Sequence, residues 1–228
     1  MSIRQRIARI RQIESRLYLA SMSTRPLSTV YGFDRGNPVD RRYIEEFLAQ
    51  NAKFIQGHCI EVKDDTYLRR FGAERVISSD VLDVNADNPC ANVVGDLQDL
   101  KTVADASYDC AVVTNTLQYL RDPRRGVSEL HRILAPGGTA LVTLPCLGRP
   151  GAEEFAVVDG IDYWRFMPAG VAALFADLSW DVDVARYGNA LVGTAIWHGM
   201  AIEDLPRRAW QINDAAWPCV IGVRARKP

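Results

Sequence analysis

The chain has 228 residues, of which 48% are hydrophobic and 24% charged, and its formal net charge is −1. This length and composition predict one compact domain with a large apolar core, and they exclude a disordered or fibrous chain. The near-zero charge excludes a strong general attraction to nucleic acid or to an anionic membrane, so we expect no nucleic-acid partner.

The cysteine pattern, the absence of metal-ligand motifs and the polar N-terminal sequence argue against disulfides, a metal site and membrane insertion. The five cysteines are an odd number, and no pair of them has metal-ligand spacing, which indicates a reducing compartment. We find no HExxH sequence and no cluster of histidines and acids at metal-ligand spacing, so no metal site is predicted. Residues 1–17 are too polar for a signal peptide, and no apolar run reaches the length of a membrane span. We therefore expect a cytoplasmic protein.

Residues 1–56 are expected to form N-terminal helices and a lid or docking segment. Apolar residues at helical spacing, separated by arginines, are Ile3, Ile7, Ile10, Ile13 and Leu17. Such a helix either lies on a membrane surface or docks on the body of the protein or on a second subunit. The narrow apolar stripe favours docking, and the assembly that this predicts is a homodimer formed through the N-terminal helix.

The segment that follows is rich in loop-forming residues. Glycines and a proline between residues 32 and 38 predict a loop, and residues 39–50 then read as a helix. Tyr31, Asp34 and Arg35 in this loop form either a lid over a pocket or an ordinary packed connection.

From residue 57 onward, short apolar strands alternate with helical patterns. The predicted strands span residues 57–62, 75–80, 92–95, 108–114, 139–144, 180–187 and 217–226. The predicted helices span residues 123–134, 169–178 and 189–200. Strands that alternate with helices predict an α/β fold with a mostly parallel sheet and helices on both faces. Residues 57–228 are expected to form this domain within one compact molecule.

Acidic residues stand at the ends of three of the first five predicted strands, at Glu61, Asp80 and Asp96. Ligands of open α/β sheets bind beyond the carboxyl ends of the strands, where a nucleoside offers ribose hydroxyls and an adenine amino group to such acids. Glu61 and Asp80 are about 20 residues apart, as in nucleotide-binding βαβ units. Any one acid is more often a helix cap or a solvated turn, but the set is more specific than its members.

Residues 108–145 read YDCAVVTNTLQYLRDPRRGVSELHRILAPGGTALVTLP. An aromatic–Asp pair opens the fourth strand, a Leu-x-aromatic-x-x-Asp-Pro turn follows it, and Arg-Ile-Leu-x-Pro-Gly-Gly precedes the fifth strand. The residues at these positions are Tyr108, Asp109, Leu117, Tyr119, Asp122, Pro123, Arg132, Ile133, Leu134, Pro136, Gly137 and Gly138. This block, about a sixth of the chain, resembles the class I S-adenosylmethionine (SAM)-dependent methyltransferases of type 11.

Two further stretches, GFDRGNPVDRRYIEEFL and DYWRF, resemble a bacterial subgroup often found beside or fused to glycosyltransferases. The family resemblance implies a Rossmann-like, seven-stranded, mostly parallel sheet whose last strand is antiparallel. The subgroup resemblance implies a role in secondary metabolism and an acceptor that is a sugar or a glycosylated metabolite.

The family resemblance also implies roles for the strand ends, with SAM as the cofactor. Glu61 would lie by the first loop, and Asp80 would bind the ribose hydroxyls. Asp96 and Leu97 would bracket the adenine. The floor beneath the methionine part of SAM would be formed by Thr114 and Asn115.

The first loop departs from the family pattern, which is acid-x-Gly-x-Gly-x-Gly. Here residues 61–67 read EVKDDTY, without a glycine, although those glycines permit unusual backbone angles and a close approach to the ligand. Three readings follow. In the first, side chains replace the backbone amides, so that Lys63 holds the carboxylate of SAM and Asp64 or Asp65 holds its ammonium group. In the second, the fold persists without SAM binding. In the third, the pocket binds SAM or a relative without methyl transfer. We favour the first, because the acids at the strand ends form a retained polar site.

Methyl transfer from a sulfonium depends mainly on positioning, and a general base helps when the acceptor is a hydroxyl. The candidate catalytic residues are Tyr119, Tyr163 and His198. The aromatic string at residues 162–166, with its arginine, either contacts the acceptor or anchors the helix that follows it.

The function that the resemblance implies is SAM-dependent methyl transfer to an oxygen or nitrogen of a small-molecule acceptor. The alternative is a catalytically inactive protein of the same fold that acts as an interaction partner or scaffold.

Overall fold

The computed structural model describes residues 23–151, 162–176 and 178–228. The expected N-terminal helix, and any dimer contact that it makes, lies outside the described residues. None of the helices in the described ranges is long and apolar enough to cross a bilayer.

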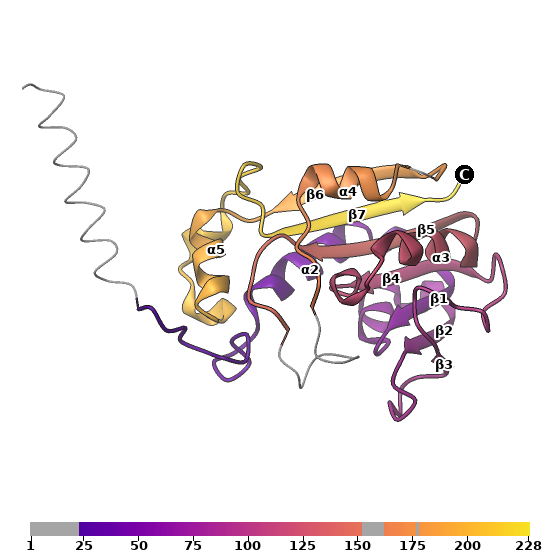
Figure 1. Ribbon diagram of the computed structural model, residues 1–228, viewed down its shortest axis with the longest axis horizontal. Coiled ribbons are helices and arrows are strands. Elements are labelled where there is room, and N and C mark those ends of the chain that lie inside the picture. Colours follow the sequence, from indigo (N-terminus) through magenta and orange to yellow (C-terminus); the bar gives the residue numbers. More distant parts are fainter. Residues whose placement is uncertain (1–22, 152–161, 177) are drawn as a thin grey trace, which may run out of the picture.

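A twisted seven-stranded sheet runs through the molecule (Figure 1), in the order β3-β2-β1-β4-β5-β7-β6. The strands are β1 (Gly57–Val62), β2 (Val76–Asp83), β3 (Val93–Val94), β4 (Tyr108–Thr114), β5 (Leu134–Pro145), β6 (Asp181–Tyr187) and β7 (Val220–Arg226). Strands β1 to β5 pair in parallel, and β7 is antiparallel to both β5 and β6. The predicted α/β class, the seven mostly parallel strands and the antiparallel last strand are confirmed.

Four α-helices of the described ranges cover the two faces of this sheet. They are α2 (Val39–Gln50), α3 (Pro123–Ile133), α4 (Pro168–Leu174) and α5 (Ala190–Trp197). One apolar cluster joins the sheet to α3 and α4, and a second cluster joins it to α2 and α5. The helix α3 begins where the sequence predicts, because Asp122 caps it by accepting a hydrogen bond from the Arg124 N–H and Pro123 fits the first turn.

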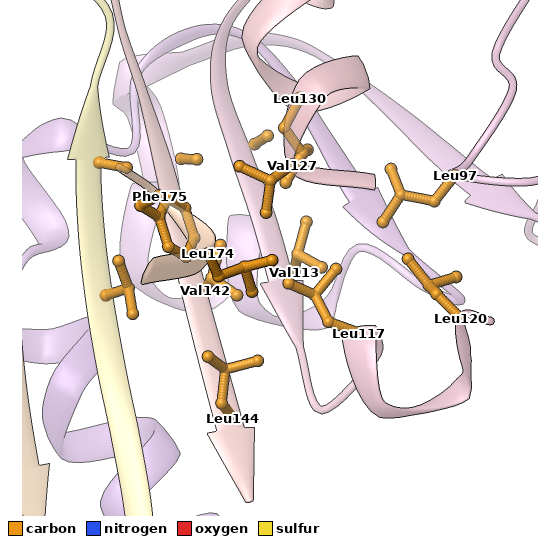
Figure 2. Packing of buried hydrophobic residues seen from close by; sticks show 14 of the residues in the cluster. Leu97, Val113, Leu117, Leu120, Val127, Leu130, Val142, Leu144, Leu174 and Phe175 are labelled. Carbon is orange, nitrogen blue, oxygen red and sulfur yellow. The ribbon is translucent and has the colours of Figure 1, made fainter. Parts of the chain in front are cut away.

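The central strand β4 shows why both layers form. Ala111 and Val113 belong to the cluster under α3 and α4, whereas Cys110 and Val112 belong to the cluster under α2 and α5. Successive side chains of a strand point to opposite faces, so a strand that is apolar throughout must be covered on both sides. Figure 2 shows the first cluster, in which Val113 lies beside Val127 and Leu117.

The helix α2, although it precedes the first strand, packs directly on the sheet. Gly222 of β7 lies so close to the Phe47 ring that a Cβ atom there would come within 2.3 Å of it. Tyr43, Phe47 and Leu48 are each at most 2% exposed. This packing fixes the start of α2 above the edge of the sheet where the strands end.

Several element ends differ from the sequence prediction. The second strand continues to Asp83 instead of ending at Asp80, the fifth begins at Leu134, and the helix predicted over residues 169–178 ends at Leu174. The extension of β2 has a tertiary cause, because Glu61 and Val62 of β1 pair with Val81 and Leu82. Strand pairing, and not the local pattern, therefore decides which acid stands at the end of β2.

Candidate functional site

A cavity of about 490 Å³ lies at the carboxyl ends of β1, β2, β4 and β5, beneath the start of α2. Its volume is within the range of about 300–1,000 Å³ that is usual for small-molecule pockets. The cavity sits where the strand order reverses, between β1 and β4, which is the position where open α/β sheets bind their ligands.

Glu61 lies at the end of β1 and organises the loop that follows. Its carboxylate accepts hydrogen bonds from the backbone N–H groups of Tyr67 and Leu68, at 3.3 and 2.8 Å. Asp64 accepts another from the N–H of Thr66, at 2.9 Å. The N–H groups at the start of this helical turn are thus held by acidic side chains of the chain itself.

Lys63 takes the unusual backbone angle that the family pattern assigns to a glycine. Its φ is +80°, a left-handed conformation that costs a non-glycine residue on the order of 1–3 kcal/mol. Two hydrogen bonds hold it there: its N–H donates to the Leu82 carbonyl at 2.9 Å, and its own carbonyl accepts from Asn88 Nδ2 at 2.7 Å. These bonds tie the glycine-free loop to β2 and to the segment that follows β2.

The buried position of Glu61 predicts a pH-dependent stability. Burial raises the pKa of Glu61 to about 8, although the two N–H groups lower it. The native state thus keeps a proton that the unfolded chain loses near the ordinary carboxyl pKa, so stability falls as the pH rises through this window. We expect the unfolding free energy of the wild type to fall relative to Glu61→Gln by on the order of 2–4 kcal/mol between pH 5 and 8.

Urea unfolding of both proteins at pH 5, 6.5 and 8 measures this difference. Glu129→Gln is the matched control, because its partner Arg132 lowers the pKa of Glu129 and leaves that carboxylate charged across the whole window. A constant difference between wild type and Glu61→Gln over these three pH values would contradict the expectation.

The acid that borders the cavity at the end of β2 is Asp83 and not Asp80. Asp83 lines the cavity and is 7% exposed, and its carboxylate accepts from the Asn85 N–H and from Asn88 Nδ2. Asp80 lies three residues earlier within the strand and outside the cavity lining. There it accepts from the Tyr108 hydroxyl and from Asn92 Nδ2, at 2.8 and 2.7 Å. The register of β2 places Asp80 in a packing role between strands.

Four other residues proposed for cofactor binding line the same cavity. These residues are Asp96, Leu97, Thr114 and Asn115. Leu97 is 3% exposed and belongs to the core cluster shown in Figure 2, whereas Asp96 is exposed and accepts from the N–H of Gln98. Lys63 also lines the cavity, but Asp65 does not, because its carboxylate pairs with Arg69 at 2.7 Å.

Asp40, in the first turn of α2, is a cavity residue that sequence reasoning missed. Its carboxylate accepts a hydrogen bond from Asn115 Nδ2 at 2.8 Å, across 75 positions of sequence. Burial raises the pKa of Asp40, against the lowering effect of Arg41 and Asn115. In the sequence, Asp40 looks like an ordinary acid in a first helical turn, which the helix dipole favours, so only its place above β4 reveals it.

The three candidate catalytic residues fall in different places. Tyr119 and Tyr163 line the cavity, and the Tyr163 hydroxyl accepts from Arg121 Nε at 3.1 Å. Burial, with Asp162 nearby, raises the pKa of Tyr119 to about 12, so its phenol stays protonated near neutral pH. His198 does not line the cavity; it ends α5, and its carbonyl accepts from the N–H groups of Leu27 and Ser28.

The aromatic string at residues 162–166 divides between the cavity and the core. Asp162, Tyr163 and Arg165 line the cavity, whereas Phe166 is buried in the core and Trp164 donates from Nε1 to the Leu120 carbonyl. The core packing of Phe166 fits the anchoring role, whereas contact of the other residues with an acceptor stays a prediction. In the described parts of the chain, no group of three or more metal-ligating side chains could hold a metal ion.

The comparisons with known proteins agree with this geometry. Residues 49–142 match the family described as "Methyltransferase domain". No curated protein matches the sequence. Among solved structures, a SAM-dependent methyltransferase from Mesorhizobium loti is similar, with a TM-score of 0.56 and 15% identity over 86% of this chain and 100% of its own.

Two further solved structures share the fold. The [4+2]-cyclase SpnF has a TM-score of 0.56 and 13% identity, with 85% of this chain and 84% of SpnF covered. Phosphoethanolamine N-methyltransferase 2 of Haemonchus contortus, solved with SAM, has a TM-score of 0.55 and 14% identity, with 80% of this chain and 52% of that one covered. Residues 49–142 thus match a methyltransferase domain family, and the chain shares its fold with solved SAM-dependent methyltransferases.

Proposed function

We propose that the protein binds SAM in this cavity and transfers its methyl group to an oxygen or nitrogen of a small-molecule acceptor. The observation that carries the proposal is a row of acidic side chains around one cavity. Asp64 follows β1, Asp83 ends β2 and Asp96 follows β3. SAM presents a ribose diol, an adenine amino group, an ammonium group and a sulfonium, which are donors or cations. Carboxylates and carbonyl oxygens are their natural partners.

The residues present fit this cofactor. Asn115 and Gln118 line the cavity, and their buried side-chain oxygens, Oδ1 and Oε1, have no hydrogen-bond partner within the described structure. Such orphaned oxygens cost about 1–3 kcal/mol each when they stay unpaired, and the ammonium group of a bound SAM would satisfy them. Lys63, whose backbone is fixed by the Asn88 bond, supplies a cation for the SAM carboxylate.

The other end of the cofactor is assigned to the acids beyond β2 and β3. Asp83 would hold the ribose hydroxyls, in place of Asp80, because Asp83 is the acid that borders the cavity. Asp96 and Leu97 would contact the adenine. When bound, SAM supplies an electrophilic methyl group on a positively charged sulfur.

The chain itself supplies a proton acceptor and a donor. Asp40, held by Asn115 and raised in pKa by burial, is placed to take a proton from an acceptor hydroxyl or ammonium group. Tyr119, which keeps its proton, would donate a hydrogen bond to the acceptor. Tyr163 would help to position it, and His198 has no part in this proposal because it lies outside the cavity lining.

A calorimetric titration with SAM and with S-adenosylhomocysteine tests the proposal. We expect binding of both ligands at micromolar concentrations and a rise in melting temperature. Absence of heat and of thermal stabilisation at millimolar ligand would overturn the proposal and favour an inactive scaffold of this fold.

The finer expectations complete the proposal. A sugar or glycosylated metabolite as acceptor, membership of the bacterial subgroup associated with glycosyltransferases, and a role in secondary metabolism rest on the sequence resemblance. The cytoplasmic location rests on the cysteine pattern and on the polar N-terminal sequence. The homodimer rests on the N-terminal apolar stripe. Analytical ultracentrifugation of the full chain measures whether the homodimer forms.

A further inference from the structure

We propose that the acceptor is an anion: a ring-bearing small molecule whose carboxylate or phosphate is bound by Arg121 and Arg149. This inference rests on the proposed function and names the substrate class of the same cavity.

Charge is unevenly distributed around the cavity. The acids assigned to SAM, Asp83 and Asp96, lie at the end of β2 and after β3, on one side of the strand reversal. On the other side, Arg121 comes after β4 and Arg149 comes after β5, and both line the cavity. A ligand that extends from the first side to the second therefore meets carboxylates at one end and guanidinium groups at the other.

The two arginines keep unused hydrogen-bonding capacity. Arg121 Nε donates to the Tyr163 hydroxyl at 3.1 Å, and Arg149 donates from one Nη to the Thr29 carbonyl. A guanidinium has five N–H donors, and a planar fork of two of them matches a carboxylate or a phosphate. Within the described ranges, no carboxylate forms an ion pair with either arginine.

The neighbouring Arg165, in contrast, has its charge neutralised by a carboxylate. Arg165 pairs with Asp162 through two hydrogen bonds, at 2.5 and 2.8 Å, and also donates to three backbone carbonyls. Its role is to fix the chain around Gly148, so it offers no charge to a ligand. Asp162 is paired with Arg165, so within the described residues Arg121 and Arg149 have no carboxylate partner.

Aromatic side chains stand beside both arginines. The Arg149 guanidinium lies over the Tyr31 ring, 4.6 Å from its centroid, and Arg121 contacts Tyr163. Tyr31, Tyr119 and Tyr163 all line the same cavity. Rings of this kind stack on a planar group or on the apolar face of a sugar, while the arginines bind a charged substituent.

The test uses two ligand pairs that share a ring and differ in charge: benzoate with benzamide, and glucose 1-phosphate with glucose. Thermal shift and calorimetry measure binding of each ligand to protein saturated with S-adenosylhomocysteine. We expect at least one anion to bind at low millimolar concentration and its neutral partner to bind at least tenfold more weakly. We also expect Arg121→Gln and Arg149→Gln each to weaken that anion at least tenfold, as loss of a charge-assisted contact predicts.

Arg208→Gln is the matched control, because Arg208 is exposed and lies outside the cavity lining. Equal binding of anion and neutral ring, equal effects of all three variants, or no binding of either anion at 10 mM would overturn the inference. Binding of S-adenosylhomocysteine separates this failure from failure of the proposed function, since both arginine variants should keep it within about threefold of the wild type. Comparing benzoate with glucose 1-phosphate also shows whether the site binds a carboxylate or a phosphate.

Discussion

Replacing Asp40 by asparagine should lower kcat by about 100-fold or more and leave the Kd for SAM within about threefold of the wild type. A positioned general base contributes typically about 10²–10⁴-fold. Burial raises the pKa of two cavity acids, Asp40 and Glu61, but Glu61 is engaged by the Tyr67 and Leu68 N–H groups, which leaves Asp40 as the candidate base. The substitution preserves the fold, because an asparagine oxygen still accepts the hydrogen bond from Asn115 Nδ2. The activity assay uses whichever anionic acceptor the ligand pairs reveal.

The pH dependence of kcat is a second test of the Asp40→Asn variant. The wild-type kcat should rise with pH through the raised pKa of Asp40 and then level off, and Asp40→Asn should lack this rise. Glu45→Gln is the control on the same helix, since Glu45 pairs on the surface with Arg70 at 2.7 Å. A large rise in the Kd for SAM with an unchanged kcat would show instead that Asp40 holds the cofactor.

Asp83→Asn should weaken SAM binding by about 10- to 100-fold, whereas Asp80→Asn should change it by less than threefold. A hydrogen bond to a charged group is worth about 1.5–3 kcal/mol, and Asp83 is the acid that borders the cavity at the end of β2. Asp80 is occupied by Tyr108 and Asn92 and is expected to affect stability more than binding.

The pair is a matched comparison, because both substitutions remove one charge from the same strand. Calorimetry with SAM measures the affinities, and urea unfolding measures the stabilities. The opposite order, with Asp80→Asn weakening SAM binding more than Asp83→Asn, would contradict the assignment and restore the one drawn from sequence spacing.

The prediction for Asp83 depends on where β2 ends, and the local sequence pattern determines that position only in part. The strands at 57–62 and 108–114 and the helix at 39–50 have the bounds that the sequence predicts. Their apolar runs are bounded by residues that change the pattern at both ends, so the signal is local. The end of β2 is set by pairing of Val81 and Leu82 with β1, across 20 positions of sequence.

The loop after β1 likewise has features that the sequence predicts and features that only distant contacts explain. The absence of glycine in residues 61–67 is visible in the sequence, as is the presence of acids and a lysine there. The left-handed backbone of Lys63 cannot be read from the sequence, because the hydrogen bonds that hold it come from Leu82 in β2 and from Asn88 in the loop after β2. The strained conformation persists since distant groups stabilise it.

The amino-acid pattern alone predicts the α/β class, the alternation of strands and helices and the gathering of acidic residues at one edge of the sheet. Only the tertiary structure decided that Asp83 and not Asp80 reaches the cavity, that Asp40 meets Asn115, and that Arg121 and Arg149 share one side of it. Periodicity is a property of neighbouring residues, whereas the direction of a side chain depends on strand register and helix packing, which join residues far apart in the chain.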